Sequence, residues 1–585
     1  MEGIMKHSKQ IVAFILALVL VFSISGCKAE EKTPTFDEFI RQEFVDSMEA
    51  DYSTMHFYLE QPEKMGVDPS KAQVGWGTPP VLDRSEDRAA FEEELKLFES
   101  FDRESLTKEQ QVTYDVYKYL LDLNGKLLDE KFDGYTQYFS SNSGLQFSLT
   151  TNLTSWPLRN EQDVKDFITV VKDTKNYVDG VLEYTRQQAD KGLLSVDVQS
   201  VIDFCDDILE TGMEGSTLEG MCDTVDAMQL GDTAKEDYKK QLLQAYEESV
   251  LPAYQAIRDT LEELFDKNNS EGMAKLPYGK EYYELLMQSA TGTDMTVEEV
   301  RSMMEDAADE HFANLLVLYS ESQGARDYVD TGALDTGFTS YEEILDYIEQ
   351  AMTEDFPAVS DMEYVIFDLG EDVSDTGVAA YFVNPALDST APKQMRVNPN
   401  HGDIADIEVY NTVAHEGFPG HMYQFAYLYE NITTPLMKLI NIGGYTEGYA
   451  VYASYQASKY LEEKGIDAGA LEAQKEYETY LYALVVQLDI GIHYDGWSLE
   501  TFNQKCDEIG LMAGEELYNQ LQGDPCVFEN YYVGYEQFRA LREKAEDALG
   551  EKFTDIGFHE AILRNGIAPF SMVEKSVDEY IANAG

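Results

Sequence analysis

The chain has 585 residues, of which 110 are acidic and 43 basic, and its formal net charge is −67. Such an acidic protein repels phosphate backbones and anionic lipid, which argues against a nucleic-acid partner; solubility is the simplest role for the charge. The length exceeds the roughly 250–300 residues at which a single core stops growing, so we expect two subdomains around one cleft.

The N-terminus has the pattern of a targeting segment. Two lysines precede an apolar run from Ile11 to Phe22, which is too short to span a bilayer but typical of a signal peptide. Ile24–Cys27 resembles a lipobox, in which cleavage leaves Cys27 lipidated. We predict a signal peptide over 1–26, a lipidated tether over 27–35 and an exported protein held on the extracytoplasmic face of the cell membrane. A plain secretory signal with a chance cysteine is the alternative.

Residues 36–290 are predicted to form an N-terminal helical subdomain, and 291–585 a catalytic subdomain. Apolar residues between Val164 and Leu182 recur at helical spacing, and polar-apolar segments such as Asp237–Leu264 repeat the pattern. Clusters of Gly and Pro at 65–80, and of Ser, Asn, Thr and Gly at 140–155, predict loops.

The start of the second subdomain has a sharper signal. Thr296 to Glu299 form a capping box, which predicts a helix from there to about Leu318. The preceding Ala290–Thr293 is the candidate boundary between the two subdomains.

Four cysteines follow Cys27, and they fall into two close pairs: Cys205 with Cys222, and Cys506 with Cys526. In an exported protein this spacing favours two local disulfides, and free buried thiols are the alternative. No cysteine spacing matches a zinc site.

Residues 362–398 interrupt the helical pattern. Three short runs rich in β-branched and aromatic residues predict strands at 363–367, 379–383 and 394–398. This small sheet lies just before the most chemically suggestive stretch of the chain. It either binds an extended substrate along its edge or is a structural hairpin that caps the helices.

His415, Glu416 and His421 place two imidazoles and a carboxylate within seven residues, in a chain with eight histidines. A hydrolytic zinc site needs three protein ligands, an open position and a carboxylate base. The usual H-E-x-x-H spacing is four, whereas here it is six, which leaves the histidines about 120° apart on a straight helix. Pro419 and Gly420 break helices, so we expect a bulge that returns His421 to the metal side. A helix end with two ordinary histidines is the alternative.

Three further positions are candidates for the same site. Glu447 lies in the first turn of a predicted helix that follows Gly443 and Gly444, where a glutamate is most often a surface residue. Asp489 and His493 share a helical face, so that Asp could orient His493 as an oxyanion donor, unless they are a core or surface pair. Tyr531 and Tyr532 are candidates for a second donor.

Several stretches together resemble the bacterial family called domain of unknown function 885, which is grouped with the zincin metallopeptidases. The matching stretches are Thr412–His421, Leu276–Tyr283, Ala380–Phe382, Glu447–Tyr452, Asp489–His493 and Phe558–Pro569. The resemblance runs from about residue 36 to the C-terminus. Met422 stands where the family often has His, and Tyr449 where it often has Trp; neither is a proposed ligand.

The resemblance implies a mainly α, two-lobed zincin-like metallopeptidase with a small β-sheet beside the cleft. It implies one Zn²⁺ bound by His415, His421 and Glu447, with Glu416 as general base and a peptide as substrate. His493, Tyr531 and Tyr532 stay candidates for oxyanion stabilisation. A non-catalytic solute-binding lipoprotein, or a metal hydrolase acting on an ester or a non-peptide amide, are the alternatives. The sequence predicts neither the oligomeric state nor the choice between endo- and exopeptidase action.

Overall fold

The computed structural model describes residues 34–141, 144–369, 379–512 and 514–585. The predicted signal peptide, Cys27 and the tether up to residue 33 lie outside these residues. Within them, no helix is both long and apolar enough to cross a membrane. The fold is mainly helical with one small sheet, as predicted.

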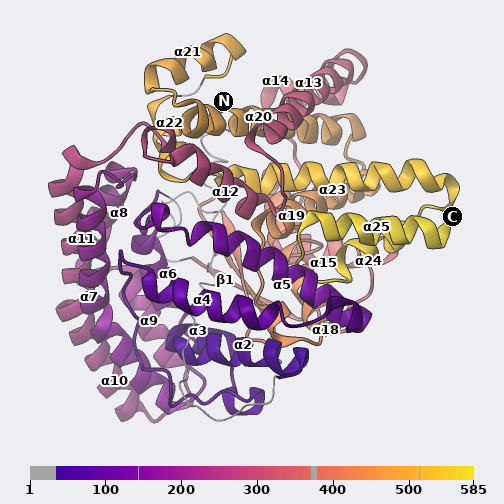
Figure 1. Cartoon of the computed structure of the whole chain (residues 1–585). Coiled ribbons are helices and arrows are strands. Elements are labelled where there is room, and N and C mark those ends of the chain that lie inside the picture. Colours follow the sequence, from indigo (N-terminus) through magenta and orange to yellow (C-terminus); the bar gives the residue numbers. More distant parts are fainter. Residues whose placement is uncertain (1–33, 142–143, 370–378, 513) are drawn as a thin grey trace.

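The described residues of the first half form helices and no strands, and they make up one side of the molecule, coloured indigo to magenta in Figure 1. Its helices are α2 (Phe36–Ala50), α3 (Tyr52–Tyr58), α4 (Ser85–Phe98), α5 (Lys108–Leu127), α6 (Leu145–Ser155), α7 (Glu161–Asp190), α8 (Val198–Thr211), α9 (Ser216–Ala227), α10 (Asp232–Ala245), the π-helical turn η5 (Tyr246–Val250) and α11 (Leu251–Leu264). Helix α7 confirms the periodic pattern around Val164 and Leu182, and its apolar side is fully buried.

Helix α6 corrects the loop predicted over 140–155. The hydroxyls of Thr151, Thr154 and Ser155 donate to carbonyls of the preceding turn, as from Thr154 to Thr150 O at 3.0 Å, so they are satisfied within the helix. Leu149 and Leu153 are fully buried. Apolar burial thus outweighs the low helix propensity of the polar residues.

The second half adds further helices around the sheet, coloured from magenta and rose through orange to yellow in Figure 1. They are α12 (Gly279–Thr291), α13 (Val297–Glu321), α14 (Gln323–Thr331), α15 (Tyr341–Ala351), α17 (Ile407–Glu416), α18 (His421–Asn431), η9 (Pro435–Lys438), α19 (Gly443–Ser458), α20 (Ala468–Ile490), η11 (Gly491–Asp495), α21 (Leu499–Ile509), α22 (Glu515–Gly523), α23 (Val527–Leu549), α24 (Asp555–Leu563) and α25 (Phe570–Ala584). The capping box at Thr296 is confirmed as the start of α13.

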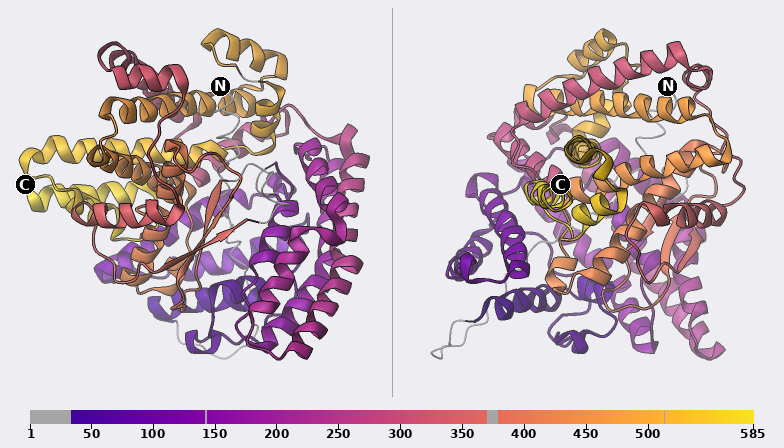
Figure 2. Two further views of the ribbon diagram at one scale, coloured as in Figure 1. Left: turned by 180° about the vertical axis from the view of Figure 1, so that it is seen from behind. Right: turned by 90° about the vertical axis from the view of Figure 1, so that its right-hand side faces the viewer.

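The three predicted strands are confirmed as β1 (Tyr364–Asp368), β2 (Ala380–Val383) and β3 (Lys393–Val397). β3 is central, parallel to β1 and antiparallel to β2, so that β2 lies at one edge of the sheet. In the view from behind, the sheet lies between the magenta helices and the orange and yellow helices (Figure 2, left).

Two large hydrophobic cores contain most of the buried apolar side chains of the described residues, and Phe147, Leu369 and Tyr381 form a small third cluster. The first is built from residues 36–264 together with Leu436 and Leu439 of the η9 region. The second runs from Met273 to Val577 and also takes in residues of α5 and its surroundings, such as Val116 and Leu123. The two cores therefore meet near η9, which directly precedes α19.

The four cysteines of the described chain are free, so the predicted disulfides are wrong and the alternative of free thiols holds. Cys205 and Cys506 are buried on helices α8 and α21, and burial raises the pKa of the Cys506 thiol to about 11. Cys526 faces buried carboxylates rather than Cys506. Proximity along the chain therefore does not bring the sulfurs of either pair into a bond, although the two members of each pair pack in the same hydrophobic core.

Candidate metal and catalytic site

The seven-residue motif is divided between two helices. α17 ends at Glu416, α18 begins at His421, and residues 417–420 connect them. A Cβ at Gly417 would overlap the side chain of Leu345, and one at Gly420 would overlap the carbonyl oxygen of His415. Glycine therefore lets the chain fold back at both ends of the connection. The predicted bulge is a complete break between helices.

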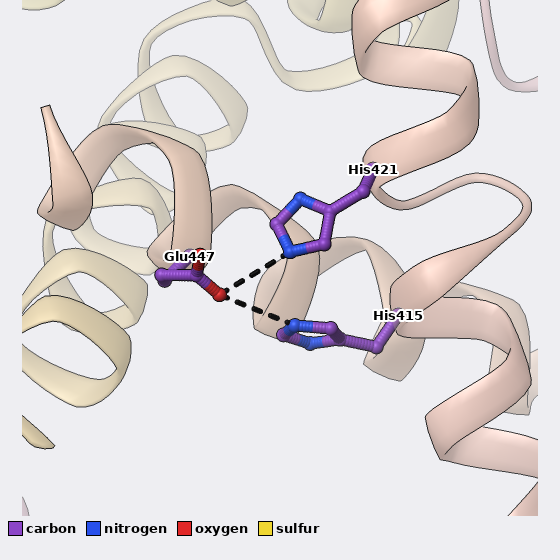
Figure 3. Close-up of side chains that lie close together, drawn as sticks. All are labelled: His415, His421 and Glu447. Carbon is purple, nitrogen blue, oxygen red and sulfur yellow. Dashed lines mark hydrogen bonds and ion pairs between the residues drawn. The ribbon is translucent and has the colours of Figure 1, made fainter. Parts of the chain in front are cut away.

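The break brings both imidazoles to one carboxylate, as Figure 3 shows. Glu447 Oε2 lies 3.4 Å from His415 Nε2 and 3.2 Å from His421 Nε2. The two rings are perpendicular, with centroids 4.7 Å apart. One ligand atom from each residue lies within 4.8 Å of the others, so the three side chains can share one cation. Glu447 is 4% exposed and not a surface residue.

The electrostatics of this trio follow from burial and pairing. Burial alone would raise the pKa of Glu447, but the two imidazoles outweigh it and lower that pKa to about 2. Burial alone would lower the pKa of His421, but Glu447 and Glu416 raise it to about 9. The protein therefore concentrates opposite charges at a buried point, where a cation can replace the imidazole protons.

Glu416 is held by the sheet. The backbone N–H of Phe382, in edge strand β2, donates to Glu416 Oε2 at 2.8 Å. The other oxygen, Oε1, is 3.9 Å from His415 Nε2. Burial raises the pKa of this carboxyl above its usual range. A carboxylate with one fixed oxygen, one oxygen toward the metal side and a raised pKa has the properties of a general base.

Cavities open on both sides of Glu416. One, between α17, α19, α20 and α23, is lined by His415 and Tyr532 among others. The other is lined by His421, Glu447, Phe382 and, from the N-terminal helices, Tyr58. Glu416 therefore lines both cavities, and each also contains one or two of the three potential ligands.

The two candidate tyrosines occupy different places. The ring of Tyr531 lies 6.0 Å from that of His415, at an interplanar angle of 25°. Tyr532 lines the cavity beside Glu416, and its hydroxyl donates to Glu478 Oε1 at 3.0 Å. Both are almost completely buried on α23. Tyr531 is thus the one beside a proposed ligand, and Tyr532 the one beside the cavity.

The assignment of His493 as an oxyanion donor is wrong. Its Nδ1 accepts from the backbone N–H of Met273 at 3.1 Å, so its Nε2 carries the hydrogen and donates to Leu521 O at 2.8 Å. The ring is completely buried, and it lines neither cavity beside Glu416. His493 therefore joins η11 to the segments around Met273 and Leu521, and no N–H is left for a substrate.

Sequence reasoning missed other residues of the site. Asn411 and Tyr482 line one cavity and Lys438 the other. Glu408, Asn411 and His415 are spaced i, i+3 and i+7 on one face of α17, a helical signal that could have found Asn411. Arg396, in β3, lies over the ring of Phe367, with its guanidinium carbon 4.7 Å from the ring centroid.

A second group of potential ligands lies in the core of the described chain. One potential ligand atom from each of Asp489, Cys526 and Glu529 lies within 4.8 Å of the others, as in the histidine site, and all three residues are buried. The Tyr283 hydroxyl lies 2.6 Å from Asp489 Oδ2 and 3.2 Å from Glu529 Oε1. Neither cavity beside Glu416 reaches this group, so we assign it no part in the proposed reaction.

Comparisons with known proteins agree with this architecture. The family model described as "Bacterial protein of unknown function (DUF885)" matches residues 64–577. Two solved structures, each described as a "putative lipoprotein", share the fold. The protein from Colwellia psychrerythraea has a TM-score of 0.79 at 16% identity, with 94% of this chain and 99% of that chain covered. The protein from Shewanella oneidensis has a TM-score of 0.61 at 15% identity, with 93% and 99% covered. No curated protein matches the chain.

Proposed function

The chain belongs to the DUF885 family, whose function is unknown, and we propose from its site that it is a zinc metallopeptidase of the zincin type. The observation that carries the proposal is the convergence of His415, His421 and Glu447 from three helices. Ligands on a tetrahedron with bonds of about 2.0–2.1 Å lie roughly 3.3–3.4 Å apart. The distances of 3.2 and 3.4 Å from Glu447 to the imidazoles fit that value.

The donor set suits zinc in type as well as spacing. Two imidazoles and one carboxylate are a ligand set of catalytic zinc sites, which keep a fourth position open. Other divalent ions compete for such ligands, so metal identity is part of the test. Bound there, zinc would polarise the scissile carbonyl and make water acidic near neutral pH.

Glu416 is the proposed general base. Its Oε2 is held by the N–H of Phe382, which leaves Oε1 to accept a proton from the attacking water. The same carboxyl then donates that proton to the leaving amine. Tyr531 is the proposed hydroxyl that stabilises the oxyanion, because its ring lies against that of His415. Tyr532 lines the cavity, but its one O–H donates to Glu478, so it can serve as a donor only if that hydrogen bond breaks.

Edge strand β2 is the proposed platform for the substrate backbone. The N–H of Asn398, in the residue after β3, donates to Ala379 O. Hydrogen-bonded pairs alternate along an antiparallel ladder, so with the observed register the backbone N–H and C=O groups of Tyr381 and Val383 point toward β3. The backbone groups of Ala380 and Phe382 then face outward, and Phe382 N–H already reaches Glu416. An extended peptide that pairs with this edge would pass directly beside the proposed base.

The proposed location is the outer face of a membrane, with the protein anchored by lipid on Cys27. The support is the lipobox-like Ile24–Cys27 and the description of both structural relatives as lipoproteins. A polybasic surface is an unsuitable anchor in a chain of net charge −67.

The test combines metal content with a single variant. Purified protein should contain one zinc per chain and cleave members of a mixed peptide library. Glu416→Gln keeps an oxygen for the Phe382 N–H, so it should keep the zinc while kcat falls roughly 100-fold or more. Exposed Glu500→Gln is the control and should leave both unchanged.

Three results would overturn the proposal. Protein without stoichiometric metal, or with metal but no hydrolysis, would point to a solute-binding lipoprotein. Cleavage of esters or non-peptide amides alone would point to a different metal hydrolase. Full peptide hydrolysis by Glu416→Gln would show that the base is assigned wrongly.

A further inference from the structure

The cavity beside His415 has walls from four helices. We call it the acidic pocket and define it by Glu408 and Asn411 of α17, Tyr455 of α19, Glu478 and Tyr482 of α20, and Tyr532 of α23. Its volume is about 60 Å³. Since one buried water needs roughly 10–15 Å³, the pocket has room for about four water-sized groups.

Polar atoms in this pocket lack partners. Both amide atoms of Asn411 and the hydroxyl of Tyr482 are buried without a hydrogen-bond partner. The residues themselves are only 9% and 4% exposed. A buried polar group without a hydrogen-bond partner destabilises the fold, so an interior seldom keeps several together unless a ligand or water binds them. These atoms leave hydrogen-bonding groups in the pocket for a polar ligand or for water.

The charge of the pocket is negative. Glu408, Glu478 and the proposed base Glu416 contribute carboxylates, and no lysine or arginine lines the pocket among the residues that the structure describes. Burial, followed by the charges of Glu478 and Glu408, raises the pKa of Tyr482 far above its usual range. Glu478 Oε1 accepts from Tyr532 and its Oε2 from Gln474 at 2.5 Å, so the carboxylate is fixed in place. A fixed carboxylate in a partly desolvated pocket attracts a cation strongly.

We propose that the acidic pocket is the subsite for a cationic nitrogen of the substrate. The nitrogen is either the free ammonium of the peptide N-terminus or the side-chain cation of a lysine or arginine near the scissile bond. The Asn411 oxygen and the Tyr482 hydroxyl accept its hydrogens, and Glu478 and Glu408 balance its charge. This inference rests on the proposed peptidase function, whose substrate class it narrows.

The geometry of α17 gives the distance between this subsite and the proposed ligand His415. Asn411 lies four residues before His415 on α17, and Glu408 seven, which corresponds to about 6 and 10 Å along the axis. An extended peptide covers roughly 3.3–3.6 Å per residue. The pocket thus accommodates an N-terminus two or three residues before the scissile bond, or a long basic side chain next to it.

The test compares charged and neutral partners of the same shape. Cleavage of alanine oligopeptides with free and with acetylated N-termini reports on the terminal ammonium. Cleavage of acetylated peptides with lysine or with norleucine beside the scissile bond reports on the side chain. One of the two cationic members should have a kcat/KM roughly 10- to 100-fold higher than its neutral partner, since hydrogen bonds to charged groups are the strong ones.

Glu478→Gln supplies the matched variant. It keeps an oxygen for Tyr532 but removes the charge and the oxygen that accepts from Gln474. The preference should therefore disappear, with cationic and neutral substrates cleaved at equal kcat/KM by this variant. Glu500→Gln, on exposed α21, should keep the full preference. Comparing the cationic with the neutral substrate in each variant cancels any general loss of folded protein.

Binding separates this inference from the peptidase proposal. Titration calorimetry of Glu416→Gln with trialanine, acetyl-trialanine, acetyl-lysine amide and acetyl-norleucine amide needs no turnover. Tighter binding of a cationic probe, lost in Glu416→Gln/Glu478→Gln, would support the subsite even if nothing is cleaved. Peptide cleavage with equal rates and equal binding for cationic and neutral partners would overturn the subsite and leave the peptidase in place.

Discussion

Three buried glutamates differ in their protonation because their neighbours differ. Glu447 faces two imidazoles, which lower its pKa to about 2. Burial raises the pKa of Glu416, which the two imidazoles only partly offset. Burial and the neighbouring Asp489 raise the pKa of Glu529 well above its usual range. A carboxylate beside imidazoles is ready to bind a cation, whereas one beside another carboxyl has to keep a proton.

Glu529→Gln should therefore stabilise the protein. Asp489 Oδ1 and Glu529 Oε2 have no partner, and the glutamine amide supplies donors where the acid needs a proton. Glu529 has a raised folded pKa, so its contribution to stability falls as pH rises above about 4.3, its unfolded pKa. While Glu529 stays protonated in the fold, the advantage of the variant should grow by about 1.4 kcal/mol per pH unit. Denaturant unfolding of both proteins between pH 5 and 8 measures it.

The opposite result would change the assignment of this cluster. If Asp489, Cys526 and Glu529 hold a metal, Glu529→Gln lowers stability at every pH and the zinc content falls by one ion per chain. Metal analysis of the same samples distinguishes a metal site from a protonated carboxyl pair. A constant stability difference across the pH range would show that Glu529 does not carry the proton.

At the scale of elements, the crossing of α19 and α23 sets the geometry of the site. α19 carries Glu447 and α23 carries Tyr531 and Tyr532. The helices approach so closely at Gly448 that a Cβ there would lie 2.7 Å from Tyr535 N and collide with the backbone of Gly534. Two glycines therefore fix how near α19, with Glu447, lies to α23, with Tyr531.

Gly448→Ala should separate these helices. The obstacle is backbone rather than a movable side chain, so we expect a loss near or above 3 kcal/mol, the upper end of usual overpacking costs. Zinc affinity should fall too, because Glu447 is the adjacent residue. Gly231→Ala, in a helix cap with open space around it, is the control and should cost within about 1 kcal/mol. Unchanged stability and metal binding in Gly448→Ala would contradict the role of this crossing.

Local signals in the sequence predict much of the fold. The capping box at Thr296, the periodic face of α7 and the three strands are set by short-range patterns, and each is found where predicted. Helix α6 was missed because its polar composition favours a loop until burial of Leu149 and Leu153 is known. Burial depends on the rest of the fold, and no local pattern shows it.

The functional site, like the fold, could be predicted from the sequence only where short-range patterns determine it. The break at residues 417–420 was visible as Pro419 and Gly420, and the turn back of His421 follows from it. His493 was misassigned because its spacing from Asp489 is right, while its two hydrogen-bond partners, Met273 and Leu521, lie far away in the sequence. The acidic pocket needs four helices, so only the spacing within α17 hinted at it.

At the scale of the whole molecule, the site lies where the two cores meet. Leu436 and Leu439 belong to the first core, whereas Met437 and Ile440 belong to the second. Lys438, in the same segment, lines the cavity next to His421 and Glu447 together with Tyr58 from the N-terminal helices. Residues from both halves of the chain thus form one wall of the site. Relative movement of the halves would change its width.

The excess of acidic residues acts on the molecule as a whole. With 110 acidic and 43 basic residues, repulsion opposes folding because compaction brings like charges together. The screening length falls from about 30 Å at 0.01 M salt to about 10 Å at 0.1 M, which is shorter than the distance across the molecule. We therefore expect the unfolding temperature to rise by at least about 2 °C between 0.01 and 0.3 M sodium chloride.

Most of that rise should occur below 0.1 M, where the screening length changes most, and potassium chloride should act equally. Sucrose of the same osmolality, which screens nothing, is the control and should reproduce less of the effect. The zinc site should respond differently, because buried charges are screened little, so zinc affinity should change less with salt than the unfolding temperature does. An unfolding temperature that is flat or falling across this range would show that local pairing has already neutralised the surface repulsion.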